Sequence, residues 1–435
     1  MKNLLRIVLM LFLLIALASC DEGDEGGNTT PGNTDTGSDT TQTGDTADTA
    51  FNGQQLTGVK FLKSLTLQEV QSVMFLLQLQ VPDLAAVTAN ITGGVSIYRV
   101  TYRTAYMGAP VSASALLIIP EGNVALPVLS FQNGTNTLAS DAPTLSVETS
   151  LNIRMISASA ALGYAVVVAD YLGFGESAQL FHPYLCRDVT ASSLADLLRA
   201  VVEYSDTPQS PLQLSGDLYL MGYSQGGHAT MALHEYLERT PDFPLVLQGT
   251  AAGAGPYDLT AVNQFMLSTP TYPMPYFAPY AVMAFRSLGF LGNDLSLYFK
   301  APYATTIPGL FDGTKSADEI NGALNTDLTL LMTDLTINVS MGVASDAPAA
   351  LALQTAFVAN SIPPFAATSP IRLSHGTADT YIPPSVTTAF QQAMIGAGTP
   401  AANISVVQIP DKDHESAAPL AIVDAIMWFA GLNAN

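Results

Sequence analysis

Five consecutive residues, Gly222-Tyr223-Ser224-Gln225-Gly226, form a G-x-S-x-G pattern. This pattern is typical of a serine held in a tight turn between a strand and a helix. Glycine is needed two residues to either side because the backbone is strained and packs closely there. We therefore predict that Ser224 is a nucleophile and that the backbone N–H of Gln225 stabilises a developing oxyanion.

A serine nucleophile needs a base, and the chain contains five histidines. In this arrangement the order along the chain is serine, acid, histidine. Only His375 and His414 follow Ser224 at a distance, and only His414 also follows a suitable acid. We therefore predict that His414 is the base.

The other three histidines have less informative positions. His182 precedes a proline in a predicted loop and could line a pocket. His228 and His234 lie on the helix expected after the serine, and we interpret them as structural residues of that helix.

Asp379 is the predicted acid. It follows a short apolar stretch, residues 371–374, and precedes His414 by 35 residues. A carboxylate there would accept the ring N–H of His414, fix its tautomer and stabilise the imidazolium. We interpret Asp411 and Asp413, which also lie near His414 in sequence, as solvated loop charges.

A second oxyanion donor is expected from the turn that follows residues 126–131. This turn reads Gln132-Asn133-Gly134-Thr135, and its glycine would let a backbone N–H approach the site. We predict that Thr135 is the donor.

These residues must be positioned by a repeated order of buried strand, turn and helix. The apolar stretches expected to form strands are residues 95–104, 111–119, 126–131, 164–170, 217–222, 371–374 and 404–409. Continuous apolar strands that alternate with helices indicate a mostly parallel central sheet flanked by helices, and hence an α/β protein. Function in such sheets gathers at the carboxyl ends of the strands, where all the candidates above fall. Ahead of these strands, Thr66-Leu67-Gln68-Glu69 predicts a helix that begins with a capping box.

The repeated order breaks between about residues 260 and 365. Aromatic residues, methionines and prolines are frequent there, and the prolines interrupt any long helix. We interpret this segment as an inserted helical cap within a domain that spans residues 53–435. Its apolar side chains either contact a hydrophobic substrate or pack the core of the cap.

Composition excludes several functions. The 435 residues include 48% apolar residues and carry a formal charge of −21, which supports a large core and argues against binding to nucleic acid. Two cysteines cannot form a cysteine-rich zinc site. The predicted chemistry needs neither a metal nor a cofactor.

The first 20 residues are typical of an export signal. Lys2 and Arg6 precede an apolar stretch that is short for a membrane span, and Leu17-Ala18-Ser19-Cys20 closes it. These four residues resemble the lipobox of bacterial lipoproteins, which implies a lipid on Cys20 and a lone thiol at Cys186. Residues 21–52 are acidic and rich in Thr, Gly and Asp, which predicts a disordered tether. We expect an exported lipoprotein, anchored at the outer membrane or cell surface.

Taken together, the motifs resemble the α/β-hydrolase superfamily. The resemblance covers about residues 95–430 and includes Asn-Gly-Thr at 133–135, Gly-Tyr-Ser-Gln-Gly-Gly at 222–227 and His-Gly-Thr-Ala-Asp at 375–379. Residues 170–177 are similar to a D-x-x-G-x-G-x-S turn that shapes the site in this superfamily. Gln132-Asn133 is a departure, because many members have a histidine before the glycine.

Within the superfamily the chain looks most like secretory lipases and esterases, which carry a cap before the acid-bearing strand. This resemblance implies a serine hydrolase that acts on small hydrophobic esters through Ser224, His414 and Asp379. A serine peptidase would use the same three residues. A non-catalytic surface binding protein is the other alternative, although such proteins usually lose the serine or the histidine. The oligomeric state stays open.

Overall fold

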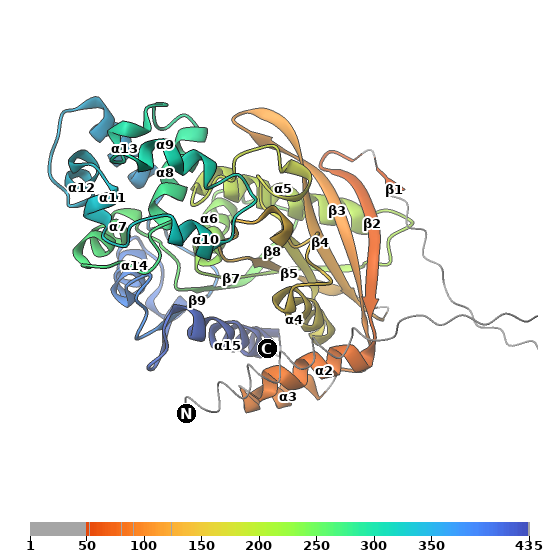
Figure 1. Ribbon diagram of the computed structural model, residues 1–435. Coiled ribbons are helices and arrows are strands. Elements are labelled where there is room, and N and C mark those ends of the chain that lie inside the picture. Colours follow the sequence, from red (N-terminus) through yellow and green to blue (C-terminus); the bar gives the residue numbers. More distant parts are fainter. Residues whose placement is uncertain (1–48, 52, 80, 90, 123, 434–435) are drawn as a thin grey trace, which may run out of the picture. The chain divides into compact units, whose positions relative to one another are not determined.

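The computed structural model describes residues 49–51, 53–79, 81–89, 91–122 and 124–433. The predicted signal segment, Cys20 and nearly all of the predicted tether lie outside these residues. A ten-stranded mixed sheet organises the described chain, in the order β1-β2-β3-β4-β6-β5-β7-β8-β9-β10 (Figure 1). The strands are β1 (Thr49–Ala50), β2 (Leu56–Leu65), β3 (Val95–Tyr106), β4 (Ala109–Pro120), β5 (Leu126–Gln132), β6 (Ala165–Ala169), β7 (Leu214–Tyr223), β8 (Val246–Gly253), β9 (Ile371–Gly376) and β10 (Ile404–Ile409).

The sheet has a parallel half and an antiparallel half. Strands β6, β5, β7, β8, β9 and β10 pair in parallel, as the alternation of strands and helices predicts. Strands β1 to β4 pair antiparallel, and β4 joins the parallel half through β6. The α/β prediction is confirmed, and the sheet is more mixed than the apolar stretches alone indicate.

Three strands have no clear signal in the sequence, and one of them, β1, pairs with β2 at the end of the segment predicted as a disordered tether. Strand β2 contains two lysines and a glycine, and its central residues are only half-buried. Strand β8 is rich in alanine and glycine, which have low strand propensity. It forms because β7 and β9 pair with it on either side, so tertiary context outweighs local preference here.

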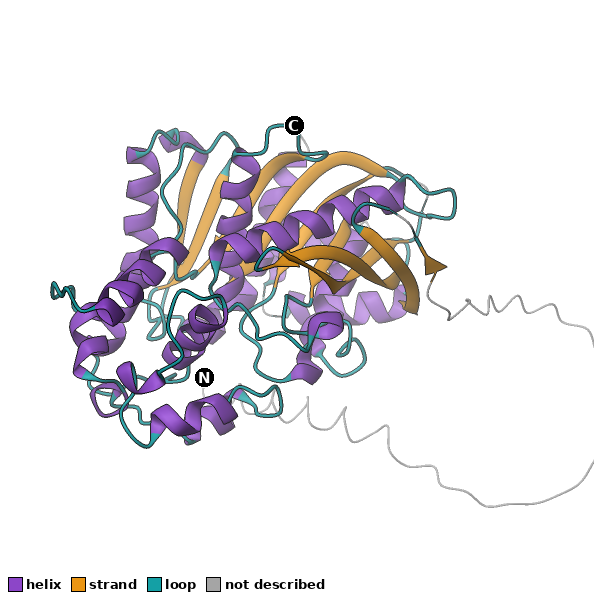
Figure 2. Ribbon diagram, turned by 90° about the horizontal axis from the view of Figure 1, so that it is seen from above, coloured by secondary structure: helices purple, strands orange, loops and turns teal. Residues whose placement is uncertain are grey.

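Helices cover both faces of the sheet (Figure 2). They are α2 (Leu67–Gln78), α3 (Ala85–Thr88), α4 (Leu151–Ser159), α5 (Arg187–Ser205), α6 (Gln225–Glu238), α14 (Pro384–Gly396) and α15 (His414–Asn433). Alternate residues of a strand point to opposite faces. Accordingly, Val167 packs in one core with α5 and α6, and Val166 and Val168 pack in another with α2, α4 and α15.

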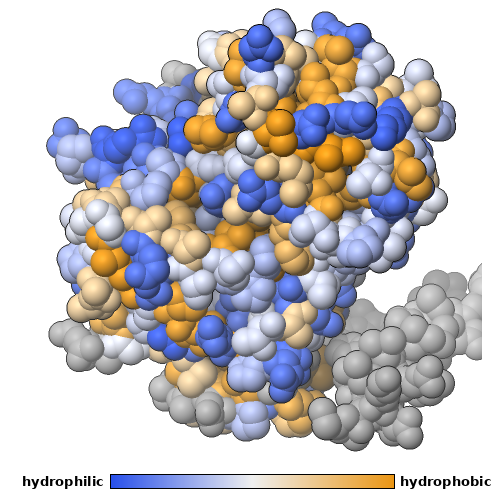
Figure 3. Space-filling view, turned by 90° about the vertical axis from the view of Figure 1, so that its left-hand side faces the viewer, coloured by the Kyte–Doolittle hydropathy of each residue, from blue (hydrophilic) through white to orange (hydrophobic). Residues whose placement is uncertain are grey.

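The cap is inserted between β8 and β9. Its helices are α7 (Leu259–Ser268), α8 (Phe277–Ser287), α9 (Tyr303–Thr306), α10 (Ala317–Gly322), α11 (Leu328–Leu331), α12 (Asp334–Ser340) and α13 (Pro348–Asn360). Many of its aromatic side chains, such as Phe285 and Phe299, are fully buried in a core that the cap shares with β9 and α14. Figure 3, which faces this side, also shows hydrophobic residues on the surface, and Leu351 and Val358 of α13 are among the exposed side chains.

Helix α15 is long and apolar enough to cross a membrane by length and composition. It packs against β7, β8 and β9, and its Val423 and Phe429 side chains are buried in the core. Core helices of soluble domains pass the same length test. Its first residue, His414, joins it directly to the candidate site.

Candidate active site

Ser224 occupies the turn between β7 and α6 with a backbone conformation that L-residues rarely adopt. Its φ is 61° and its ψ is −124°. A Cβ atom on Gly222 would lie 2.4 Å from the carbonyl oxygen of Gly226, and one on Gly226 would lie 2.0 Å from that of Gln132. Both glycines are therefore required sterically, which explains why the turn has this sequence. The turn sets Ser224 at the amino end of α6, where first-turn N–H groups have no partner within the helix.

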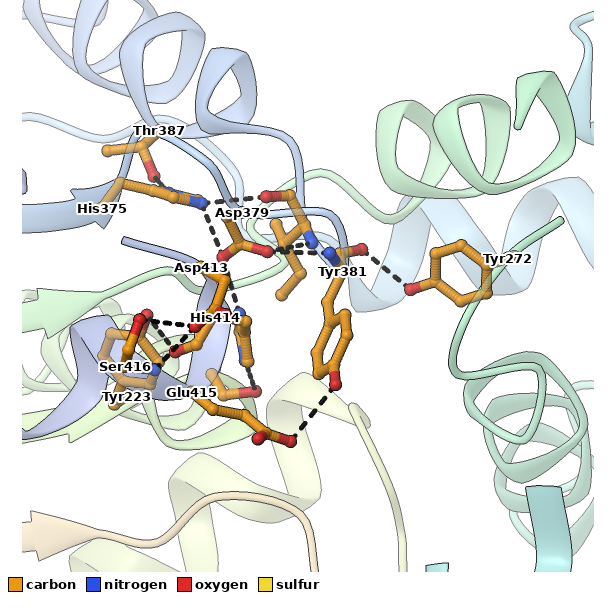
Figure 4. A network of polar contacts seen from close by, with 12 residues as sticks. Tyr223, Tyr272, His375, Asp379, Tyr381, Thr387, Asp413, His414, Glu415 and Ser416 are labelled. Carbon is orange, nitrogen blue, oxygen red and sulfur yellow. Dashed lines mark hydrogen bonds and ion pairs between the residues drawn. The ribbon is translucent and has the colours of Figure 1, made fainter. Parts of the chain in front are cut away.

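Ser224, His414 and Asp379 form one hydrogen-bonded chain. The Ser224 Oγ lies 2.8 Å from His414 Nε2, and His414 Nδ1 lies 2.6 Å from Asp379 Oδ2 (Figure 4). A carboxylate only accepts, so Nδ1 carries the proton and Nε2 accepts from the serine hydroxyl. The geometry thus leaves His414 ready to take a proton from Ser224. Ser224 comes from the turn after β7, His414 from the start of α15 and Asp379 from the loop after β9.

Asp379 is buried and accepts further hydrogen bonds. Its Oδ1 accepts from the backbone N–H groups of Tyr381 and Ile382, at 2.8 and 3.0 Å. Burial raises the pKa of Asp379, but hydrogen bonds from His375 and His414 outweigh burial and hold this pKa well below its usual range. The carboxylate therefore stays ionised, as an acceptor for His414 must.

His375 contacts the acid, a role that the sequence did not reveal. Its Nε2 lies 3.1 Å from Asp379 Oδ2 and 2.9 Å from the carbonyl oxygen of Ile382, and its Nδ1 lies 2.6 Å from the Thr387 hydroxyl (Figure 4). Two acceptors at Nε2 mean that Nε2 carries the proton and Nδ1 accepts from Thr387. The available signal was the four-residue spacing of His375 and Asp379; the structure places His375 within β9, which runs two residues beyond the predicted strand, and Asp379 in the turn after it.

His182 hydrogen-bonds to the side chain of Gln225, the residue that follows Ser224. Its Nδ1 donates to the carbonyl oxygen of Leu172 at 2.8 Å, and its Nε2 accepts from the Gln225 side-chain amide at 2.7 Å. Burial lowers the pKa of His182 to about 4, so the ring is neutral. Within the part of the chain that the structure describes, no group hydrogen-bonds to the Gln225 Oε1 atom. His182 therefore fixes the Gln225 side chain rather than taking part in proton transfer.

The turn after β5 lies beside the nucleophile. Gly134 and Thr135 line the same cavity as Ser224, and the Thr135 hydroxyl donates to the Tyr184 hydroxyl at 3.3 Å. Asn133 donates from its side chain to the carbonyl oxygen of Ala169 at 2.9 Å. The buried Asn133 amide thus anchors this turn to the end of β6.

The remaining candidates lie away from this chain of hydrogen bonds. His228 is buried and its Nε2 lies 2.7 Å from the carbonyl oxygen of Asn360, while His234 pairs with Glu238 at 3.2 Å. Asp413 is exposed and accepts from the N–H of Ser416, 2.9 Å away, within the first turn of α15. The side chains of these three residues support helices and make no hydrogen bond to the Ser224 hydroxyl among the described residues; His228 meets Ser224 only through its backbone N–H, which donates to the Ser224 carbonyl oxygen at 3.2 Å.

Two cavities meet at Ser224. The larger, about 900 Å³, is also lined by His414 and extends between α2, α4 and α15. The smaller, about 50 Å³, is also lined by Gln225 and extends into the cap among α7, α8 and α13. Among the described residues, no cluster of three His, Cys, Asp or Glu side chains could hold a metal ion.

Comparisons with known proteins agree with this geometry. The model of the secretory lipase family matches residues 138–271. A candidate hydrolase from Legionella pneumophila is 22% identical, with a TM-score of 0.77 over 87% of this chain and 98% of that one. The ligand-bound rice cell wall degrading esterase LipA from Xanthomonas oryzae is 23% identical, with a TM-score of 0.72 over 87% and 97%.

Lipase A from Candida antarctica in its closed state is more distant. It is 18% identical, with a TM-score of 0.60 over 80% of this chain and 79% of that one. No curated protein matches the chain. The comparisons support a hydrolase of the lipase and esterase kind. The chain therefore has the α/β-hydrolase fold, and its central segment resembles the secretory lipases.

Proposed function

We propose that this protein is a serine hydrolase that cleaves hydrophobic carboxylic esters through an acyl-enzyme. One observation carries the proposal: the unbroken hydrogen-bonded chain from Ser224 Oγ through His414 to Asp379, at 2.8 and 2.6 Å. Ser224 also has a strained backbone at the end of a strand, which is the position that a nucleophile elbow gives to its serine.

The first half of the reaction forms the acyl-enzyme. Ser224 Oγ attacks the ester carbonyl carbon while its proton passes to His414 Nε2. The carbonyl oxygen becomes an oxyanion, for which the backbone N–H groups of Gln225 and Thr135 are the proposed donors. The bond to the alcohol oxygen then breaks, and His414 returns the proton to the leaving alcohol.

The second half reverses these roles. Water attacks the acyl carbonyl carbon, and His414 takes a proton from the water. The bond to Ser224 Oγ breaks, His414 reprotonates the serine, and the carboxylic acid leaves. Ionised Asp379 stabilises the imidazolium of His414 in both halves.

The apolar surroundings of Ser224 support hydrophobic esters. Phe277, Ala281 and Val282 of α8 line the cavity that reaches from Ser224 into the cap. Other cap aromatics, such as Phe285 and Phe299, are buried in the core that the cap shares with β9 and α14 and line neither cavity, so only part of the apolar content of this segment faces the site. The proposed substrate contact is therefore narrower than the composition of residues 260–365 suggests.

Replacement of Ser224 tests the proposal. Ser224→Ala removes the nucleophile, so kcat/KM on a panel of carboxylic esters should fall by roughly 10⁴-fold or more. Ser385→Ala, at an exposed serine on α14, is the matched control and should keep the wild-type rate. Amides with the same acyl groups extend the panel and separate an esterase from a peptidase. Near-normal ester hydrolysis by folded Ser224→Ala would reject the proposal.

We further propose export and lipid anchoring through Cys20. The secretory character of the matched family supports export. The anchor itself rests on the Leu17-Ala18-Ser19-Cys20 sequence. Cys186, the other cysteine, is buried and free, so it is a poor candidate for modification.

A further inference from the structure

The two cavities share Ser224 and Phe277 and differ in the other groups that line them. His414 lines only the large cavity, and Gln225 lines only the small one. An ester bound at Ser224 has an acyl part and an alcohol part that extend in different directions from the carbonyl carbon. The lining groups of each cavity therefore indicate which part of the ester it receives.

Proton transfer decides the assignment. His414 Nε2 must protonate the leaving alcohol oxygen, so that oxygen must lie within hydrogen-bonding reach of Nε2 in the tetrahedral intermediate. The alcohol part then extends into the cavity that His414 lines. The acyl part extends past Gln225 into the small cavity, while Thr135, the other proposed oxyanion donor, lies on the wall of the large cavity.

The large cavity suits a bulky group. Its volume of about 900 Å³ lies near the upper end of typical ligand pockets, about 300–1,000 Å³. Its far walls are apolar and come from Met74 and Leu77 of α2, Ile153 of α4, and Ile422 and Ile426 of α15. The small cavity, about 50 Å³, leaves room for only a short acyl group.

Polar groups line the part of the large cavity closer to the turn after β5. Asn136, Thr149 and Asn152 supply amide and hydroxyl groups there. The described lining residues include the carboxyl groups of Asp141 and Glu415 and contain no lysine or arginine. An alcohol that carries phosphate or carboxylate would find no counter-charge, so the lining favours a neutral amphipathic alcohol.

We propose that the natural substrate is an ester of a short acid with a bulky, neutral, amphipathic alcohol. The alcohol binds between α2, α4 and α15, and the acyl group enters the narrow cap cavity. This assignment rests on the proposed serine ester hydrolase function and adds the size asymmetry and the direction of binding.

A matrix of esters tests the assignment. Acetate, butyrate and octanoate esters of methanol, butanol and decanol vary the two parts independently. For the wild-type protein, kcat/KM should rise with alcohol length at constant acetate and fall with acyl length at constant alcohol. A rise with acyl length and indifference to alcohol length would overturn the proposal.

Two filling variants locate the binding of each part. Ile422→Trp on α15 should lower kcat/KM on decyl acetate roughly tenfold more than on methyl acetate, because the added ring occupies the alcohol cavity. Ala281→Leu on α8 should instead lower kcat/KM on butyrates more than kcat/KM on acetates. Val358→Trp, at an exposed position of α13, is the control. It should change neither the ratio of kcat/KM on decyl acetate to that on methyl acetate nor the ratio on butyrates to that on acetates.

The outcomes separate the two proposals. Hydrolysis that depends on Ser224, with Ile422→Trp acting selectively on long acyl groups or equally on all esters, would overturn only this assignment. Hydrolysis that survives Ser224→Ala would overturn the proposed function and this assignment with it. Leu77→Trp fills the same cavity from α2, so the test remains decisive if Ile422→Trp fails to fold.

Discussion

The carboxylate of Asp379 accepts N–H groups from two imidazoles and two backbone amides. Only one of these donors, His414, belongs to the proposed proton-transfer chain. The backbone amides fix the orientation of the carboxylate within its own turn. His375 adds a donor to the oxygen that His414 also contacts, and we expect it to keep Asp379 ionised and positioned.

Replacement of His375 should therefore weaken catalysis through Asp379. His375→Phe removes a donor, so the pKa of Asp379 should rise toward its ordinary range, and kcat should fall more steeply at the acid end of the pH profile, where Asp379 begins to protonate. We expect kcat to fall roughly tenfold, far less than the roughly 10⁴-fold loss expected for Asp379→Asn. Steady-state kinetics from pH 4 to 8 measures both effects.

His375→Gln distinguishes positioning from packing. Glutamine retains an N–H donor toward Asp379 and an acceptor toward Thr387. It should therefore restore part of the kcat lost in His375→Phe and most of the activity at the acid end of the pH profile. His228→Gln, at a buried histidine bonded to a backbone carbonyl, is the control. An unchanged pH profile in His375→Phe would show that His375 only fills space.

At the scale of elements, the sequence predicts the parts that have a local signature. Strand β7, which leads to Ser224, contains an apolar run at residues 218–221, and the Thr66 capping box begins α2 as expected. Strands β2 and β8 could not be predicted, because neighbouring strands rather than side-chain preference hold them. The contact between His375 and Asp379 could not be predicted for a similar reason. It depends on how the turn after β9 folds back on the end of that strand.

The turn after β6 depends on a buried carboxylate with an unusual titration. Asp170 accepts hydrogen bonds from Ser114 on β4 and from Thr144, and it is fully buried. Burial raises its pKa from 3.8 to about 6 in spite of these hydrogen bonds. Between these pH values the folded state binds a proton that the unfolded state does not bind.

This titration predicts the pH dependence of stability at Asp170. The contribution of Asp170 to the free energy of unfolding should be complete below pH 3.8 and should be lost as pH rises to about 6, by about 3 kcal/mol. Asp170→Asn lacks the titration, so its stability relative to wild type should increase over that range. Urea unfolding of both proteins measures the difference, and groups with lowered pKa values cancel in the comparison. A difference that stays constant across this pH range would contradict the pKa assigned to Asp170.

At the scale of the whole molecule, the proposed lipid anchor, Cys20, precedes the acidic segment in the sequence, and the hydrolase domain follows that segment. Wild-type protein expressed in bacteria should incorporate labelled palmitate and sediment with membranes. Cys20→Ala should do neither, and Cys186→Ala should behave as wild type because that thiol is buried. Lipid incorporation into Cys20→Ala would contradict the assignment of Cys20.

The domain also brings together distant parts of the chain to build one site. Ser224 and His414 are 190 residues apart in sequence, and the cap is inserted between β8 and the acid-bearing turn. The catalytic proposal therefore depends on the whole fold, and a reagent that reacts only with an activated serine tests it in one step.

Covalent labelling with a fluorophosphonate, followed by mass spectrometry of the digested protein, is the most direct measurement. We predict a single adduct on the peptide that contains Ser224, no adduct in Ser224→Ala, and much slower labelling in His414→Ala. An unlabelled wild-type protein, or an adduct that persists at another residue in Ser224→Ala, would contradict the claim that Ser224 is the nucleophile.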